Sequence, residues 1–143
     1  MINELADFAN VMVNAGGDIF ARGHDKDGPW KVAFEDPKDA KKAIGIVEVD
    51  GFALGASSPL RRQWRDRHHL VNPTEAKPAD QMLAVYTQAP AALLADAYST
   101  ALFVMGFEQA AKLLPELPIE ALLIGPNGQA WKTHGFKGKL FEV

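Results

Sequence analysis

The stretch AALLADAYSTALFVMGFEQAAKLL, residues 91–114, decides the fold of this chain, because its apolar length predicts a helix around which a core can form. Gly106 is expected to end one helix and to begin a second, shorter one. Pro90 lies near the first turn, where proline is favoured. Five apolar residues recur at helical spacing and predict the buried face: Leu94, Ala97, Ala101, Leu102 and Met105.

A polar patch interrupts this apolar run. Asp96, Ser99 and Thr100 are spaced so that a carboxylate and two hydroxyls share one face of the helix. A carboxylate among leucines is costly unless it is paired or binds a metal, and Asp96 with Thr100 offers two oxygen ligands of the kind that Mg²⁺ favours. The alternative is that Asp96 faces water near the helix N-terminus, where negative charge is favourable.

Working outward, short strand patterns surround the helix pair. Residues 3–9 predict a short helix, residues 11–15 a buried strand, and the polar residues 36–43 a connection. This order predicts an α+β fold with an antiparallel or mixed sheet packed against a central helix pair, in a single domain over residues 1–143. The other expected strands are IFARGH, GPWKVAFEDP, IGIVEV, FALGAS, RHHLVNP, MLAVYTQ and a closing hairpin of IEALLIG and AWKTHG around PNG.

Composition excludes several function classes. The chain has 143 residues, a net charge of −3 and no cysteine, so disulfides, thiolate metal sites and a cysteine nucleophile are ruled out. The sequence contains no long basic run, and a nucleic-acid partner is therefore not expected. No segment is apolar for long enough to span a membrane, and MINELADFAN does not resemble a secretory signal. As written, the sequence predicts a cytoplasmic location.

Two further segments carry candidate site residues. In NAGGDIFARG, Gly16 and Gly17 allow the backbone to approach a ligand, with Asp18 directly after them, although a simple turn between strands better explains this motif taken alone. In RRQWRDRHHLVNP, arginines suited to phosphate precede two histidines that can exchange protons near neutral pH. The alternative there is a solvated hairpin with one packed histidine. Together the three segments have what a diphosphate site needs.

The motifs NAGGDI, HHLVNP…KPAD and LADAYSTALFVMG resemble, in this order, the GGDI, HHI-DP-x-TG-x-P and ADALSTALF motifs of the ApbE family, the FAD:protein FMN transferases. The resemblance covers nearly the whole chain. It implies a reaction in which FAD is the substrate, Mg²⁺ is the metal, and FMN passes to a threonine or serine hydroxyl of a target flavoprotein while AMP is released. Some family members hydrolyse FAD to FMN and AMP instead.

The resemblance also implies roles for individual residues. The metal ligands would be Asp96, Thr100 and a backbone carbonyl of Ala15 or its neighbour. His69 would lie near the transferred phosphate as the catalytic base, with His68 as the second choice. The residues expected to bind the nucleotide are Gly16, Gly17, Asp18, Arg61, Arg62 and His68.

The chain departs from the family pattern in two ways. The N-terminal half of longer members is missing, so the site is expected to need a homodimer or a separate N-terminal half. TSG reads ASS at residues 56–58, and Asn72, Glu75 and Ala76 stand where Asp, Thr and Gly are usual. Losing that glycine affects a turn that needs positive φ. Alternative functions are therefore a non-catalytic module that binds flavin nucleotides or assembles with a partner, and an FAD diphosphatase.

Overall fold

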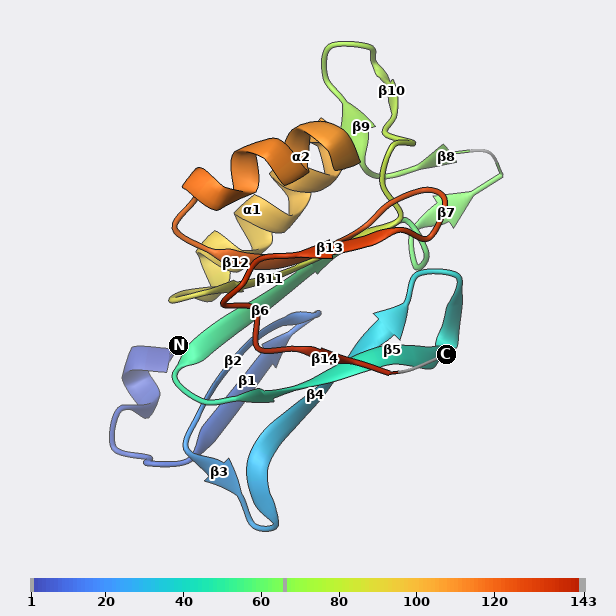
Figure 1. Cartoon of the computed structure of the whole chain (residues 1–143). Helices are drawn as coiled ribbons and strands as arrows, with labels where there is room; N and C mark the ends of the chain where they lie inside the picture. Colours follow the sequence, from blue (N-terminus) through green and yellow to red (C-terminus); the bar gives the residue numbers. More distant parts are fainter. Residues whose placement is uncertain (1, 66, 142–143) are drawn as a thin grey trace.

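A six-stranded antiparallel sheet forms the centre of the protein (Figure 1). The structure is a computed structural model and describes residues 2–65 and 67–141. The strands lie in the order β1-β2-β6-β11-β12-β13, so that β6 and β11 are central and every neighbouring pair is antiparallel. Their bounds are β1 Val11–Ala15, β2 Asp18–Arg22, β6 Phe52–Ser57, β11 Ala84–Ala89, β12 Glu120–Ile124 and β13 Ala130–Lys132.

Two helices cover one face of this sheet (Figure 1). The helices are α1 Ala92–Met105 and α2 Phe107–Leu113, and a 3₁₀ helix, η2 Leu114–Glu116, follows. Gly106, at φ +84°, separates α1 from α2 as predicted. The core beneath them is apolar, with Leu102 and Phe103 almost fully buried. The sheet and the helices thus bear out the predicted α+β class, with the helix pair on one face.

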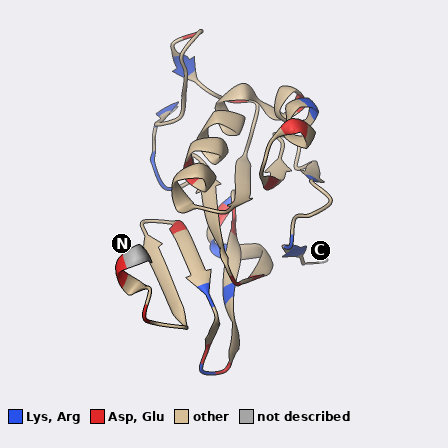
Figure 2. Ribbon diagram, turned by 90° about the vertical axis from the view of Figure 1, so that its left-hand side faces the viewer, with Lys and Arg blue, Asp and Glu red and all other residues tan. Residues whose placement is uncertain are grey.

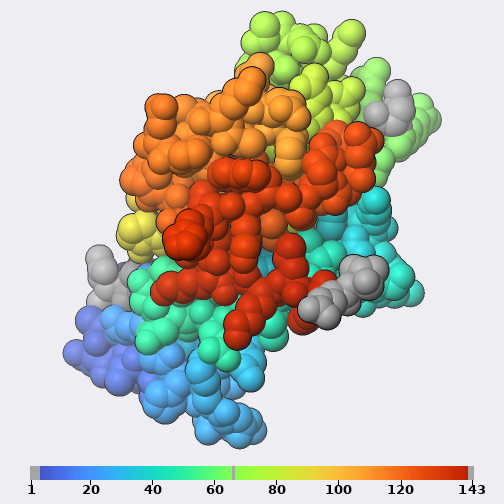
Figure 3. All heavy atoms as spheres, in the orientation of Figure 1, coloured from blue at the N-terminus to red at the C-terminus, as the bar shows by residue number. Residues whose placement is uncertain are grey.

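A long two-stranded ribbon covers the opposite face. It consists of β4 Gly28–Asp36 and β5 Asp39–Val49, which lie in a second sheet of order β14-β5-β4-β3 together with β3 His24–Asp25 and β14 Lys139–Leu140. Phe34, Val47 and Val49 of the ribbon pack against the underside of the central sheet. In the space-filling view the C-terminal residues lie across the molecule between α2 and the ribbon (Figure 3).

The helix α1 lies unusually close to the sheet. A Cβ on Gly55 of β6 would lie only 2.6 Å from the backbone carbonyl carbon of Ala95, so a glycine is required there. The buried hydroxyl of Thr87 on β11 donates to the carbonyl oxygens of Ala95, at 2.8 Å, and Gly55, at 3.2 Å. These contacts fix the first turn of α1 over β6 and β11.

The predicted buried face of α1 is mostly wrong. The buried residues are Ala95, Ser99, Leu102 and Phe103, whereas Leu94, Ala97 and Ala101 are exposed. The helix is apolar on nearly every side, so the spacing of its apolar residues does not single out one face. Small residues, Ala95 and Ser99, occupy the buried stripe because the backbones approach so closely.

Several strand predictions also need correction. Residues 36–43 are not a polar connection, because β5 begins at Asp39 and pairs back onto β4. The strand Val11–Ala15 has the predicted bounds, but it is a half-exposed edge strand. The expected strand RHHLVNP, residues 67–73, is broken into two short pieces, β8 Arg67–His68 and β9 Val71–Asn72, which pair with β7 Gln63–Trp64 and β10 Lys77–Pro78. At the N-terminus, the helix is the 3₁₀ turn η1 Ile2–Leu5 rather than residues 3–9.

Charged residues of both signs are spread along the fold (Figure 2). Within the part of the chain that the structure describes, no helix has the length and apolar character needed to cross a membrane.

Candidate functional site

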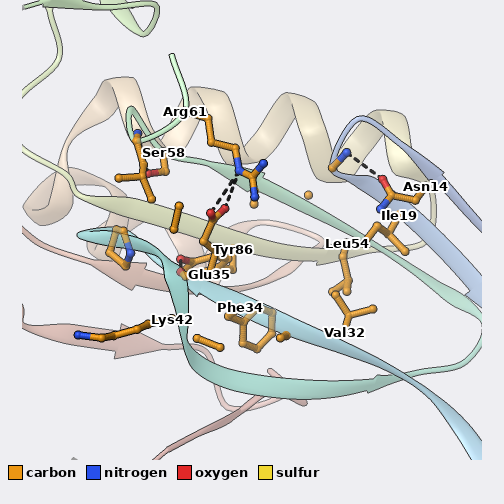
Figure 4. A pocket seen from close by; sticks show the side chains of 18 of the residues that line it. Asn14, Ile19, Val32, Phe34, Glu35, Lys42, Leu54, Ser58, Arg61 and Tyr86 are labelled. Atoms are coloured by element: carbon orange, nitrogen blue, oxygen red, sulfur yellow. Dashed lines mark hydrogen bonds and ion pairs between the residues drawn. The ribbon is translucent and has the colours of Figure 1, made fainter. Parts of the chain in front are cut away.

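The GGD motif forms a tight hairpin turn between β1 and β2. Ala15 and Asp18 pair across the turn, and Gly16 and Gly17 between them have φ values of +76° and +117°. The side chain of Asn14 accepts a hydrogen bond of 2.9 Å from the backbone N–H of Gly17 (Figure 4). Both glycines are therefore needed for the turn itself, as the more modest interpretation of the motif predicts.

Asp18 and Asp96 come together from distant parts of the sequence. The helix α1 contacts β2, and the two carboxyl groups are close enough to interact. Partial burial raises the pKa of Asp18, and the neighbouring charge of Asp96 raises it further. Two carboxylates that repel one another in this way provide a place for a cation.

Thr100 adds a hydroxyl one helical turn after Asp96. Its Oγ1 atom lies 3.2 Å from Oγ of Ser57, at the end of β6. Among the described residues, no group of three or more His, Cys, Asp or Glu side chains could hold a metal. Asp18, Asp96 and Thr100 offer oxygen atoms from two carboxylates and a hydroxyl, a set that suits a hard cation such as Mg²⁺, and Ala15 pairs with Asp18 across the turn. The chemistry of these donors fits the metal that the resemblance implies.

A cavity of about 720 Å³ lies on the other side of β6, between the central sheet and the β4–β5 ribbon (Figure 4). Its floor is apolar and includes Ile19, Leu54 and Tyr86. Gly16, Gly17 and Arg61 also line it. Asn14, two residues before Gly16, and Arg61 lie apart in the close-up of the cavity (Figure 4). Since Gly55 both lines this cavity and contacts α1, only the thickness of β6 separates the cavity from the helix that carries Asp96. The GGD turn connects the cavity with this helix, because Gly16 and Gly17 line the cavity and Asp18 interacts with Asp96.

One arginine of the basic segment reaches the cavity. Arg61 Nε lies 2.9 Å from a carboxylate oxygen of Glu35 on β4, and this bond raises the pKa of the Arg61 guanidinium. The backbone carbonyl of Glu35 in turn accepts a short hydrogen bond from the Tyr86 hydroxyl, and burial raises the pKa of that hydroxyl. Arg62 is exposed and does not line the cavity. Of the two predicted arginines, only Arg61 belongs to this site.

The two histidines differ in their surroundings, and neither lines the cavity. His68 is half-buried, lies edge-on to Phe103 of α1 at 6.0 Å between ring centroids, and accepts a hydrogen bond at Nδ1 from Leu70 N–H. His69 is exposed. One histidine is thus packed, as the alternative interpretation of this segment predicts, and the exposed one is His69.

The loop after the histidines keeps its turn without the usual glycine. Ala76 has a φ of +54°, in the left-handed region that glycine favours. Its N–H donates to the carbonyl of Asn72 at 2.9 Å, and the Asn72 side chain accepts from Thr74 N–H at 2.9 Å. Asn72 therefore provides the turn-forming side chain that an aspartate would provide. Glu75 is exposed beside it.

Three residues of the site were not predicted from the sequence. Ser57 lies in the ASS segment that replaces TSG, so that motif was a signal for it. Asn14 lies within NAGGD, directly before the predicted glycines. Glu35 had no sequence signal, because it reaches Arg61 only through the folding of the β4–β5 ribbon.

Comparison with known proteins agrees with this geometry. The ApbE family model matches residues 2–123. The FAD:protein FMN transferases of Klebsiella pneumoniae and Treponema pallidum are 30% and 33% identical, over 87% and 88% of this chain but only 38% and 39% of their own lengths. The chain therefore spans about two fifths of the length of these relatives.

Solved structures show the same correspondence. The ApbE protein of Thermotoga maritima superposes with a TM-score of 0.79 at 28% identity, over 90% of this chain and 44% of that one. The Pseudomonas stutzeri flavinyl transferase ApbE, in its apo form, gives 0.78 at 31% identity, over 94% and 47%. With the family model matched over most of its residues and the GGD turn and α1 placed together in space, the chain belongs to the ApbE family.

Proposed function

We propose that this chain is a flavin-transfer module that uses FAD as substrate and Mg²⁺ as metal, moves FMN to a threonine or serine hydroxyl of a target flavoprotein, and releases AMP. The observation that carries the proposal is the meeting of Asp18 and Asp96 beside Thr100, at the turn that also lines the 720 Å³ cavity. Relatives that are named FAD:protein FMN transferases support it.

Asp96, Thr100 and the backbone at Ala15 would hold the cation, with Asp18 beside them. When bound, Mg²⁺ would supply positive charge to the FAD diphosphate and to the oxygen of the departing AMP. Arg61 would bind phosphate oxygens from the cavity side, and the glycines of the GGD turn allow the backbone to approach the diphosphate. The apolar floor at Ile19, Leu54 and Tyr86 suits a flat ring system.

The transfer itself exchanges one phosphorus–oxygen bond for another. The acceptor hydroxyl oxygen bonds to the phosphorus of the FMN half, and the bond from that phosphorus to the AMP oxygen breaks. We assign His69 as the base that takes the hydroxyl proton, because its ring is exposed whereas His68 is packed against Phe103. With water in place of the hydroxyl, the same residues would hydrolyse FAD.

One observation favours a second candidate function. His69 does not line the cavity, so another polypeptide that completes the site would have to bring base and phosphate together. A homodimer partner or a separate N-terminal half would fill that role. Without it, the chain would be a module that binds flavin nucleotides and does not turn them over.

The test is AMP release from FAD by the purified chain, with Mg²⁺ or with EDTA, followed by chromatography. We expect AMP only with Mg²⁺, and we expect Asp96→Asn to abolish it. Asp27→Asn is the matched control, because Asp27 is an exposed aspartate in the β3–β4 turn. Adding an acceptor flavoprotein separates transfer from hydrolysis by mass. FAD binding without AMP release would contradict catalysis by this chain alone and favour the binding module.

A further inference from the structure

Three hydroxyl groups form a chain between β6 and α1. Ser57 Oγ lies 2.8 Å from Ser99 Oγ and 3.2 Å from Thr100 Oγ1. Ser99 Oγ donates to the backbone carbonyl of Asp96 at 3.0 Å. Ser99 is fully buried and Ser57 is 5% exposed, whereas Thr100 is exposed. The three hydrogen-bonded hydroxyls therefore extend from the interior to the surface, where Asp96 and Thr100 are exposed to solvent.

Counting protons shows which hydroxyl donates and which accepts in each of these hydrogen bonds. Each hydroxyl has one proton and two lone pairs. The Ser99 proton is used at the Asp96 carbonyl, so Ser57 must donate to Ser99. The Ser57 proton is then used as well, and the contact between Ser57 and Thr100 forms only if Thr100 donates. The Thr100 proton consequently points toward Ser57, and its remaining lone pairs are left for another partner.

We propose that Ser57 is a positioning residue for the cation site: it accepts the Thr100 proton and so turns the Thr100 lone pairs toward the cation. This inference rests on the proposed function, which makes Thr100 a ligand. A threonine in a helix has an alternative, because its hydroxyl can bond the carbonyl four residues earlier, which here is that of Asp96. Ser57 competes with this alternative and holds the rotamer in which Thr100 binds.

The experiment titrates Mn²⁺ into the metal-free chain, with ADP present as a diphosphate, and follows free Mn²⁺ by electron paramagnetic resonance. We expect Ser57→Ala to weaken Mn²⁺ binding about tenfold, the usual effect of removing a residue that orients a metal ligand. Thr133→Ala is the matched control. Like Ser57→Ala, it removes a hydrogen-bonded hydroxyl, which in this case accepts from the backbone N–H of Ala121, and it should leave the affinity unchanged.

A double-mutant cycle distinguishes positioning from packing. Thr100→Val keeps the shape of the side chain and should weaken binding by itself. If Ser57 acts through Thr100, adding Ser57→Ala to Thr100→Val changes the affinity no further. A full additional loss in that background would show a packing role and overturn the inference.

The other outcomes separate the inference from the proposed function. Normal binding by Ser57→Ala, with Thr100→Val impaired, would overturn the inference and leave the proposed metal site standing. Normal binding by Thr100→Val, or the absence of Mn²⁺ binding by the unmutated chain, would overturn the proposed metal site, and the inference with it.

Discussion

Asp18 at the start of β2 interacts with Asp96 near the N-terminus of α1, and their proximity adds to the burial that raises the pKa of Asp18. The two residues belong to motifs that are far apart in the sequence, and the contact between β2 and α1 brings them together. In the absence of a cation, the two carboxylates repel each other, and this repulsion destabilises the folded state.

The first prediction is that Asp18 makes the metal-free protein less stable as the pH rises. The folded pKa is above the ordinary value of 3.8, so the unfolded chain loses its proton first. The contribution of Asp18 to stability is thus fully present below pH 3.8 and is lost as the pH rises through the folded pKa. We expect Asp18→Asn to melt higher than the unmutated chain at pH 7 in EDTA, with the difference vanishing toward pH 3.

Added Mg²⁺ should reverse this difference, because a nearby cation favours the carboxylate form. Thermal unfolding from pH 3 to pH 7, with and without Mg²⁺, checks both statements. Asp27→Asn, at an exposed position, should show neither effect. A difference between Asp18→Asn and the unmutated chain that is the same at every pH would contradict the electrostatic explanation.

The second prediction concerns the strained turn at Ala76. A left-handed conformation costs an L-residue about 1–2 kcal/mol. Glycine relieves this cost, but it also increases the conformational entropy of the unfolded chain, which lowers the stability of the fold by about 0.4–1 kcal/mol. Ala76→Gly should therefore stabilise the protein by up to about 1.5 kcal/mol in urea unfolding. Glu75→Gly, one residue earlier and without positive φ, should destabilise it. Equal losses in both variants would show that the turn is unstrained.

The third prediction separates two neighbouring arginines. Arg61 lines the cavity and Arg62 does not, so Arg61→Ala should weaken FAD binding about tenfold or more, as expected for loss of a charge-assisted hydrogen bond. Arg62→Ala should bind FAD normally. Calorimetric titration with FAD measures both, and the melting temperature should hardly change in either variant, since both side chains are exposed. Equal weakening by the two variants would indicate general charge attraction instead.

The fourth prediction separates the two histidines. His69→Ala should lower the rate of AMP release roughly 10²- to 10⁴-fold with little change in stability, as for loss of a general base. His68→Ala should chiefly lower the melting temperature, because it removes the contact with Phe103 and the bond from Leu70 N–H. Rates across the pH range, together with melting curves, measure both effects. A larger loss of rate in His68→Ala at full stability would reverse the assignment.

Patterns that depend on local chemistry could be predicted from the sequence. The two glycines before Asp18, the break at Gly106 and the hairpin around PNG follow from backbone preferences at single positions, and the structure confirms them. The expectation of positive φ at position 76 came from the family resemblance instead, and Ala76 adopts that conformation despite its side chain.

Features that depend on tertiary packing could not be predicted. The buried face of α1 is set by its close approach to Gly55, and the helix sequence alone is apolar on nearly every side. The pairing of Glu35 with Arg61 depends on the path of the β4–β5 ribbon, to which residues 39–43 belong although they are polar. Their side chains are exposed on a two-stranded ribbon, so no apolar alternation marks them as a strand.

The close contact of α1 with Gly55 and Thr87 also affects which metal ion the protein would bind. With the Ala95 backbone against Gly55 and hydrogen-bonded to Thr87, the helix cannot slide to widen the gap between Asp96 and Asp18. Ca²⁺ needs longer bonds and more ligands, and it is accommodated by flexible loops, whereas Mg²⁺ requires short, nearly octahedral bonds. Under the proposed function, a carboxylate ligand mounted on so rigid a support would discriminate by ionic radius and would favour the smaller ion.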